Sequence, residues 1–279
     1  MDHHLIESIE KAQEAVAKAD ALLITAGAGM GVDSGLPDFR GNEGFWKAYP
    51  AIAHLGYSFV EMANPAWFDR DPQLAWAFYG HRLNLYRATT PHQGFSWLLE
   101  LAQHKQAHFV FTSNVDGQFQ KAGFLEEQIL ECHGSIHHFQ CTQCDAPIYD
   151  APPHPIKIEM KCFYAKETPR CPRCGAVARP NILMFQDWGW KSERTHQQTL
   201  RYEAFLKEVH HKKLRLVILE IGAGTHIPTV RHESEQRALD LDGFAVRINP
   251  REPEIPPHLG VGIAQGGLAG LKAILKPTL

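Results

Sequence analysis

The chain has 279 residues, 44% of them hydrophobic and 21% charged, and a formal net charge of -3 at pH 7. This balance excludes disordered and fibrous proteins, and the length allows one large domain or a large domain carrying a small one. The negative charge argues against nucleic acid or an anionic membrane as partner. No apolar run approaches the ~20 residues that cross a bilayer, and the acidic, amphipathic start lacks a signal-peptide core, so we expect a cytoplasmic protein.

The first predicted element is an amphipathic helix over residues 5–18, where apolar residues recur at helical spacing. Residues 21–25 (ALLIT) are too short a run for a helix and precede glycines, which indicates a buried parallel strand. Similar runs predict further strands at 108–112, 214–221 and 244–248. Helical patterns lie at 73–87, 92–104, 194–211 and 228–239. Alternation of strands and helices predicts an α/β fold with a Rossmann-like, doubly wound parallel sheet.

Two segments interrupt this alternation. Residues 42–90 are rich in aromatic side chains and mostly helical in pattern, and residues 137–180 contain two cysteine pairs and a proline-rich stretch. We interpret both as insertions that together form a smaller module, one helical and the other metal-binding. The larger domain then consists of residues 1–41, 91–136 and 181–279.

A glycine-rich loop over residues 27–41 (GAGMGVDSGLPDFRG) follows the first strand. Glycines at the end of a parallel strand let main-chain N–H groups approach a phosphate, and ligands bind at this edge of such sheets. A tight strand-to-helix turn is the alternative explanation. Phe39 and Arg40 add an aromatic ring and a cation beside the predicted phosphate site.

Four of the six cysteines form two C-x-x-C pairs separated by 26 residues. Each pair supplies two thiolates from a tight turn, and together the pairs can close a tetrahedral zinc site with no open position. The predicted ligands are Cys141, Cys144, Cys171 and Cys174. Reduced structural cysteines or a redox pair are the alternatives. Cys132 and Cys162 stand outside the pairs.

The glycine-rich loop, which ends in Pro37, Asp38, Phe39 and Arg40, resembles the nucleotide-binding signature of the sirtuins, the NAD-dependent protein-lysine deacylases. Further motifs of that family follow in order along nearly the whole chain. They are residues 112–117 (TSNVDG), His133 with Gly134, the cysteine pairs, residues 179–185 (RPNILMF) and Ile248 with Asn249. The chain is therefore similar to a sirtuin throughout, with a Rossmann-like NAD-binding domain and a zinc-bearing module.

The resemblance implies a set of NAD-binding residues. By this resemblance, Asp116 forms a hydrogen bond with the nicotinamide amide, and Asn114 orients the ribose or a water molecule. The alternative is that both residues only form turns after a strand, as Asn and Asp often do. The complete set is Gly27, Ala28, Gly29, Asp38, Phe39, Arg40, Ser113, Asn114, Asp116, Gly222, Gly224 and Asn249.

His133 is the candidate general base, with Asn114 as the second catalytic residue. Imidazole titrates near neutrality and can take a proton from a ribose hydroxyl. By the sirtuin mechanism the acyl oxygen of the substrate lysine attacks the ribose, and the products are nicotinamide, free lysine and O-acyl-ADP-ribose. An alternative makes Cys132 a nucleophile activated by His133, but adjacent residues of an extended chain point to opposite faces.

The resemblance also implies the substrate site. A protein or peptide adds as a strand along residues 181–185, where the Leu183 carbonyl meets the acyl-lysine amide and Phe185 lines the lysine tunnel. An ordinary apolar strand is the alternative. Tyr79 and Arg82 resemble the Tyr-x-x-Arg pair of sirtuins that prefer succinyl- or malonyl-lysine, because guanidinium and phenol can bind an acyl carboxylate. Otherwise Tyr79 packs in the module and Arg82 is solvated on its surface.

Four departures from the family pattern surround these sites. Ser113 replaces Gln, Gly31 replaces Ser, Gln186 with Asp187 replaces Gly-Glu, and residues 222–224 (GAG) replace Gly-Thr-Ser. The last change removes two hydroxyls that contact ribose or phosphate and leaves main-chain donors. The rival functions are a sirtuin-like mono-ADP-ribosyltransferase or NAD hydrolase, and a non-enzymatic scaffold.

Overall fold

The computed structural model describes residues 3–38, 45–47 and 49–276, and its centre is a parallel sheet of six strands. The strands lie in the order β11-β10-β9-β1-β2-β3. Their bounds are Gly260–Ile263, Phe244–Ile248, Leu216–Ile221, Ala21–Ala26, Ala107–Thr112 and Ile129–Glu131, in that order. The central strand β1 is buried along its whole length, as expected of a strand covered on both faces.

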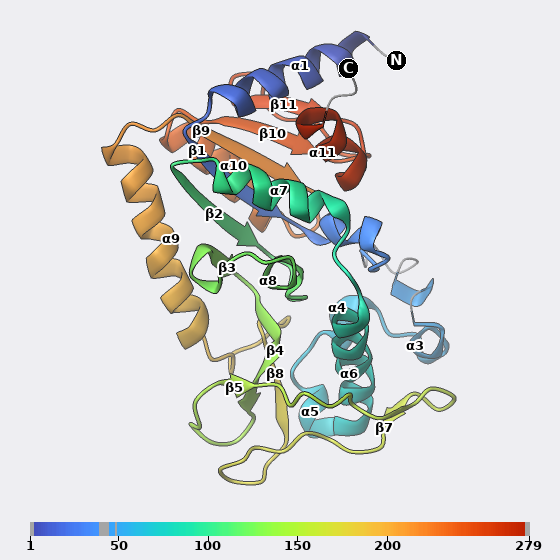
Figure 1. The fold of residues 1–279 in the computed structure, drawn as a ribbon. Coiled ribbons are helices and arrows are strands. Elements are labelled where there is room, and N and C mark those ends of the chain that lie inside the picture. Colours follow the sequence, from blue (N-terminus) through green and yellow to red (C-terminus); the bar gives the residue numbers. More distant parts are fainter. Residues whose placement is uncertain (1–2, 39–44, 48, 277–279) are drawn as a thin grey trace.

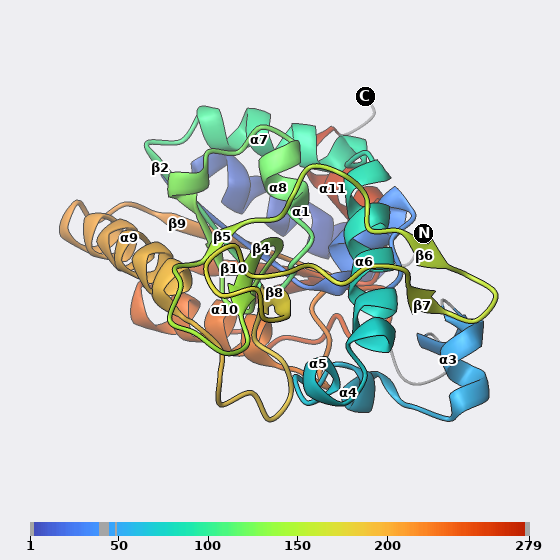
Figure 2. The same ribbon diagram turned by 90° about the horizontal axis from the view of Figure 1, so that it is seen from below.

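Helices cover both faces of this sheet (Figure 1, Figure 2). On one face, Leu22 and Ile24 of β1 pack among side chains of α1 (His3–Lys18), α7 (Gln93–Gln103) and α11 (Gly267–Leu275). On the other, Ala21 and Leu23 pack against α9 (Glu193–His211) and α10 (Thr229–Asp240). Successive side chains of a strand point to opposite faces of the sheet, so this one apolar segment contributes to two hydrophobic cores. The predicted doubly wound α/β fold is confirmed.

The predicted helices over 5–18, 73–87, 92–104, 194–211 and 228–239 are all present, as are the four predicted strands. Strand β9 begins at Leu216, two residues later than the predicted start at 214. Two strands of the central sheet and one helix packed on it are missing from the prediction. Strand β3 has only three residues, and β11 (GVGI) and α11 (GLAGLKAIL) are short and contain glycines. Glycine is unfavourable in strands and helices, so the sequence pattern does not indicate these elements.

A second lobe lies beneath the sheet in Figure 1. Its helices are α3 (Pro50–Leu55), α4 (Phe59–Met62), α5 (Trp67–Arg70) and α6 (Pro72–Ala88). Its strands are β4 (Gly134–Cys141), β5 (Tyr149–Asp150) and β8 (Ala178–Ile182) in one antiparallel sheet, and β6 (Ile158–Glu159) with β7 (Tyr164–Ala165) in a second.

The two predicted insertions share one apolar core in this lobe. The Trp76 indole of α6 donates a 2.8 Å hydrogen bond to the Ala178 carbonyl, and the Asn84 amide exchanges two hydrogen bonds with the main chain of Ile156. The two insertions pack so closely at Gly80 that a Cβ there would lie 2.7 Å from the Ile156 side chain. The predicted boundaries at 136/137 and 180/181 fall inside β4 and β8, and the division into domains stays a prediction.

Short helices occupy the loops around the sheet. They are the 3-10 helices η1 (Ala28–Ser34) and η2 (Glu126–Gln128) and the α-helix α8 (Gln118–Lys121). Among the described residues, no helix combines the length and the apolar character that crossing a membrane requires.

A buried ion pair shapes the segment that follows β8. The Arg179 guanidinium donates to both Asp187 carboxylate oxygens, at 2.7 and 2.8 Å, and the two side chains are 3% and 0% exposed. The same carboxylate accepts the N–H groups of Met184 and Gly189, both at 3.2 Å. Residues 183–189 are therefore folded around one charge.

Asp187→Asn should reduce the free energy of unfolding by about 3–5 kcal/mol, because it leaves Arg179 buried without its counter-charge. Urea denaturation followed by circular dichroism measures the loss. Glu208→Gln breaks an exposed pair with Lys212 and is the matched control, for which little change is expected. Equal midpoints for the two variants would contradict the role of the Asp187 charge.

Candidate active site

The carboxyl ends of β1 and β9 define the place where a ligand can enter the sheet. The chain proceeds from β1 to β2 and β3 on one side, and β9, β10 and β11 lie on the other side of β1. The strand order therefore reverses between β1 and β9. In open α/β sheets, ligands bind in the crevice at such a switch point.

The loops after β1 and β9 meet there through their main chains. A Cβ at Gly27 would lie 2.8 Å from the Cα of Ala223, and a Cβ at Gly222 would lie 2.4 Å from the main chain of Gly29. Gly222 also has a φ of +66°, which side-chain-bearing residues rarely adopt. The Gly29 N–H donates to the Gly222 carbonyl at 3.0 Å. Only glycines allow the two loops to form this wall.

A cavity of about 990 Å³ opens at this wall and extends to the second lobe. Most of the predicted site residues line it. They are Gly27, Ala28, Asp38, Tyr79, Arg82, Ser113, Asn114, Asp116, His133, Leu183, Phe185, Gly222 and Gly224. Gly29 and Asn249 are not among the lining residues, and Phe39 and Arg40 lie outside the part of the chain that the structure describes.

Asn249 supports the cleft from behind. It is fully buried, its Nδ2 donates to the Ala223 carbonyl at 2.7 Å, and its Oδ1 accepts the N–H groups of Arg251 and Glu252, each at 3.0 Å. These bonds use both ends of the side-chain amide. The predicted contact of Asn249 with ribose stays a prediction.

Arg231 is a supporting residue that the sequence did not reveal. Its Nε and Nη2 donate to the Ala223 carbonyl at 3.2 and 3.1 Å, and Nη2 also donates to the Glu252 carbonyl at 2.5 Å. Residues 222–224 thus lack the usual hydroxyls but are held by an arginine from α10. In sequence Arg231 is one charged residue of a polar helix, and nothing marks it as buried.

Asn114 and Asp116 follow β2 and face the cleft. The Asn114 Nδ2 donates to the Gly27 carbonyl at 2.9 Å, which ties this segment to the glycine-rich loop. The Asp116 Oδ1 accepts the Gln118 N–H at 2.9 Å. Burial raises the pKa of Asp116 to about 6, although that hydrogen bond and the Arg82 charge oppose the shift.

His133 lies between β3 and β4, where its carbonyl accepts the Leu183 N–H at 2.9 Å. Burial lowers the pKa of its ring, so the neutral imidazole needed for proton acceptance predominates at neutral pH. Burial also raises the pKa of the neighbouring Cys132 thiol to about 12, and Cys132 is not among the residues that line the cleft. Both facts argue against the alternative of a Cys132 nucleophile.

Tyr79 and Arg82 reach the cleft from α6, and their side chains are 1% and 6% exposed. The Arg82 Nε and Nη2 donate to the Tyr86 hydroxyl at 3.1 and 3.0 Å. Its guanidinium carbon lies 5.2 to 5.7 Å from the ring centroids of Phe78, Tyr79 and Tyr86. The alternative of a solvated Arg82 on the surface is wrong.

Residues 183–185 form the rim of the cleft on the side of the second lobe. Strand β8 ends at Ile182, so Leu183 and Phe185 lie just beyond it. The Phe185 N–H donates to the Ala63 carbonyl at 2.9 Å, and Leu183 remains 39% exposed. The rim therefore presents an apolar side chain, Leu183, that is partly exposed among the described residues.

The four paired cysteines come together at one point of the second lobe. Their sulfur atoms all lie within 4.8 Å of one another, with 3.5 Å between Cys141 and Cys174 and 3.7 Å between Cys144 and Cys171. A tetrahedral zinc site with Zn–S bonds of ~2.3 Å requires sulfur atoms about 3.8 Å apart. The main-chain N–H groups of Gln143 and Cys144 donate to the Cys141 sulfur and favour its thiolate. The cluster fits one structural zinc.

Fold and site define a doubly wound α/β protein whose nucleotide-type cleft is closed by a four-cysteine lobe. The Sir2 family model matches residues 27–207. The NAD-dependent protein deacylase of Pyrococcus furiosus is 33% identical over 250 residues, 87% of this chain and 86% of that protein. NAD-dependent protein deacylase 1 of Caldanaerobacter subterraneus is 30% identical over 240 residues, 86% of each chain. The chain belongs to the Sir2 family, and the predicted resemblance is confirmed.

A solved Sir2 homologue in complex with NAD has the same fold. The two structures superpose with a TM-score of 0.70 at 23% sequence identity, over 95% of this chain and 92% of that one.

The purified protein should contain one equivalent of zinc, and Cys174→Ser should lose it. Cys162→Ser, which changes an exposed cysteine outside the cluster, should keep the metal. Lys191 donates to the carbonyls of Cys144 and Ala146 at 3.0 and 2.6 Å, so zinc removal should also speed hydrogen exchange over residues 183–191. Metal analysis and exchange mass spectrometry check both outcomes, and a metal-free protein with unchanged exchange would contradict them.

The Asp116 carboxyl should take up its proton near pH 6, above the ordinary value of 3.8. Arg82→Met should raise this pKa further, because the cation that favours the carboxylate is removed. Carboxyl ¹³C NMR measures the titration. Asp20, whose pKa is lowered to about 2 by its bonds to Arg215, is an internal control that Arg82→Met should leave unchanged. Titration of Asp116 at an ordinary value in both proteins would overturn this prediction.

Proposed function

We propose that the protein is an NAD-dependent protein-lysine deacylase. The observation that carries the proposal is that His133, Asn114 and Asp116 line the same cavity as the Gly27 and Gly222 loops and the rim of the second lobe. This reaction needs a base, polar side chains that bind NAD, a main-chain surface for its phosphates and a rim on which a peptide can bind. The activity named for the Pyrococcus and Caldanaerobacter relatives supports it.

NAD, when bound, supplies a ribose carbon that accepts the acyl oxygen as nicotinamide leaves. Its phosphates would lie on the main chain of Gly27, Ala28, Gly222 and Gly224, where no side chain intervenes. Asp116 would bond the nicotinamide amide, and Asn114, already anchored on the Gly27 carbonyl, would orient the ribose. The cavity volume of about 990 Å³ is sufficient for a dinucleotide and an acyl-lysine side chain.

His133 would take the proton of a ribose hydroxyl during acyl transfer. A neutral ring is required, and burial provides it by lowering the pKa of the imidazole. The Leu183 N–H bonded to the His133 carbonyl links this base to the rim on which the substrate peptide would bind. The base and the peptide would thus be positioned by the same segment.

Tyr79 and Arg82 would select acyl groups that end in a carboxylate. Arg82 is nearly fully buried, and its hydrogen bonds to Tyr86 direct its guanidinium into the cleft wall. An acyl carboxylate would form charge-assisted hydrogen bonds with it, whereas an acetyl group would not. Succinyl- and malonyl-lysine are therefore the preferred substrates.

Mass spectrometry of the products formed from NAD and a panel of acyl-lysine peptides tests the proposed reaction. Free lysine peptide and O-acyl-ADP-ribose are expected in equal amounts. ADP-ribose attached to protein would instead identify a mono-ADP-ribosyltransferase, and free ADP-ribose independent of peptide an NAD hydrolase. If the protein turned over no NAD at all, this would indicate the non-enzymatic scaffold instead.

His133→Ala should lower the deacylation rate by about 10²–10⁴-fold, because a general base is lost, while NAD still binds. Steady-state assays and a titration with NAD measure the two effects separately. His211→Ala, at the exposed end of α9, is the control and should retain full activity. Unchanged turnover in the His133 variant would exclude it as the base.

Arg82→Met should lower desuccinylation by about tenfold or more relative to deacetylation, since only the acidic acyl group pairs with the guanidinium, whereas an effect through the pKa of Asp116 is common to both reactions. Tyr79→Phe, which removes one hydroxyl, should have a smaller effect in the same direction. Competition between succinyl- and acetyl-lysine peptides measures the ratio. A wild-type protein that removes acetyl groups and leaves succinyl-lysine untouched would show that the pair only packs the lobe.

A further inference from the structure

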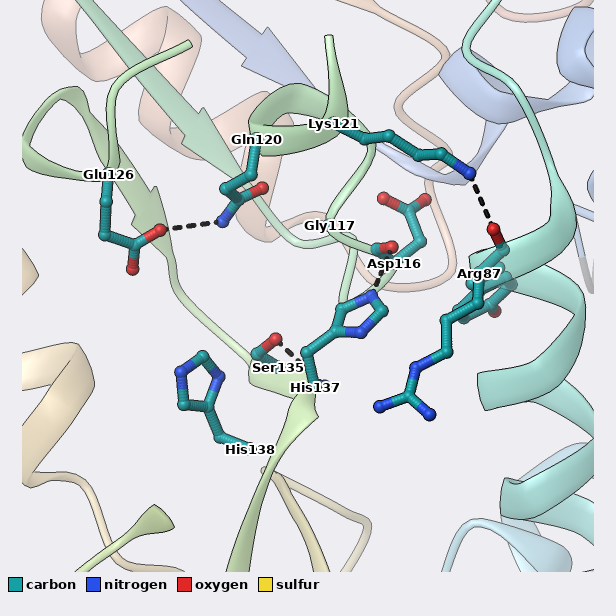
Figure 3. Close-up of a pocket in the computed structure, with 10 residues that line it drawn as sticks. Arg87, Asp116, Gly117, Gln120, Lys121, Glu126, Ser135, His137 and His138 are labelled. Atoms are coloured by element: carbon teal, nitrogen blue, oxygen red, sulfur yellow. Dashed lines mark hydrogen bonds between the residues drawn. The ribbon is translucent and has the colours of Figure 1, made fainter. Parts of the chain in front are cut away.

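A second cavity of about 370 Å³ lies between α6, α8 and the start of β4 (Figure 3). Tyr86 and Asp116 line both this cavity and the active-site cleft, so the two spaces share a wall. None of the proposed catalytic steps uses the other side chains of this cavity. They include Arg87, Lys121, His137 and His138.

Two consecutive histidines line this cavity because β4 is irregular. Its pairing with β8 shifts register between Ser135 and Phe139, which marks a β-bulge. In a regular strand, His137 and His138 would point to opposite faces. With the register shift both side chains line the cavity, and Figure 3 shows the His137 ring directed toward Asp116 and the His138 ring directed away from it.

His137 connects the second cavity to the active site. Its Nε2 lies 2.9 Å from the Asp116 carbonyl, and the ring packs so closely on Gly117 that a Cβ there would lie 2.7 Å from the imidazole Cδ2. The Ile136 N–H adds a bond to the Val115 carbonyl at 3.0 Å. The segment that carries Asp116 is therefore held from behind by the first residues of β4.

The second cavity is lined by two carboxylates, those of Asp116 and Glu126, and by two cations, those of Arg87 and Lys121. The Arg87 side chain lines the cavity, and its guanidinium donates to the carbonyls of His154 and Ala151, at 3.3 and 3.4 Å. Among the described residues it forms no ion pair, and burial lowers its pKa. The Glu126 carboxylate is already bound by Arg194 and by Gln120. A partly desolvated guanidinium without a counter-charge is costly, and an anionic ligand would remove that cost.

We propose that the second cavity binds a small organic carboxylate. Its carboxylate forms a paired hydrogen bond with the Arg87 guanidinium, and its body lies against the rings of His137 and His138. The volume suits a molecule of that size and exceeds what an inorganic ion would fill. A carboxylate matches the charge and planar geometry of one guanidinium. A doubly charged phosphate would need a second cation, and the Lys121 ammonium is already bonded to the carbonyls of Arg87 and Thr89.

Occupation of the second cavity should affect the cleft, because the ligand would restrain His137 and so the segment that bears Asp116. NAD binding to the occupied protein is expected to differ from binding to the empty one by a measurable factor. The binding site itself does not depend on which reaction the cleft catalyses.

Titration of the zinc-loaded full-length protein with benzoate, followed by the imidazole NMR signals of His137 and His138, tests the proposal. Saturable shifts of both rings are expected. Arg87→Gln should weaken benzoate binding by about tenfold or more, and Arg87→Lys, which keeps the charge but loses the paired donors, should weaken it less. Arg173→Gln, at an exposed ion pair with Asp145, is the matched control and should bind like the wild type.

Inorganic phosphate is titrated in parallel and should bind more weakly than benzoate. Equal benzoate binding by wild type and Arg87→Gln, no shift of either histidine, or tighter binding of phosphate would each overturn the proposal. Circular dichroism verifies that the Arg87 variants are folded. Arg87→Lys retains the charge at this position, so it distinguishes lost ligand contacts from lost stability.

Discussion

The close contact between the loops after β1 and β9 is the constraint on which the cleft depends. Gly27, Gly29 and Gly222 bring two main chains to a distance that excludes any side chain. This contact occurs where the strand order reverses, so the place where two main chains meet without side chains is also the place where such a sheet is open to a ligand. Arg231 and Asn249 then donate three hydrogen bonds to one carbonyl, that of Ala223. Hydrogen bonds from α10 and from the loop after β10 thus hold the main chain of the loop after β9 in place.

The second lobe positions the rim of the cleft, and its cysteine cluster is connected to that rim through hydrogen bonds. The predicted zinc ligand Cys144 lies on a turn whose carbonyls, at Cys144 and Ala146, accept hydrogen bonds from the Lys191 ammonium. Lys191 closes the segment that the Arg179–Asp187 pair has folded. That segment begins with Leu183, whose N–H bonds His133. A closed four-sulfur site cannot activate water, so its contribution is to fix the rim beside the proposed base.

The sequence predicted the features that local chemistry determines. The ALLIT run is buried on both faces, and the glycine-rich loop after β1 and the polar residues after β2 line the cleft because the carboxyl ends of parallel strands meet there. Strand β11 and helix α11 were missed because both are short and contain glycines, although Leu268, Leu271 and Ile274 of α11 recur at helical spacing. Arg231 and His137 were missed for another reason. Their roles depend on which carbonyl a distant loop presents and on a β-bulge, and neither is encoded by the residues next to them.

Asp116 is held between two cavities, and the two contacts act on different parts of the residue. Arg82 faces its carboxylate from the cleft side, while His137 bonds its main-chain carbonyl from the other. Because folding raises the pKa of this carboxyl, the ionised form lowers the stability of the native protein at neutral pH, and the surrounding core must offset that cost. The ionised Asp116 carboxylate is kept in its buried position by the hydrogen bonds that its segment forms. The main chain of Asp116 is therefore supported by β4, while the Gln118 N–H and the Arg82 charge of α6 favour its carboxylate against the effect of burial.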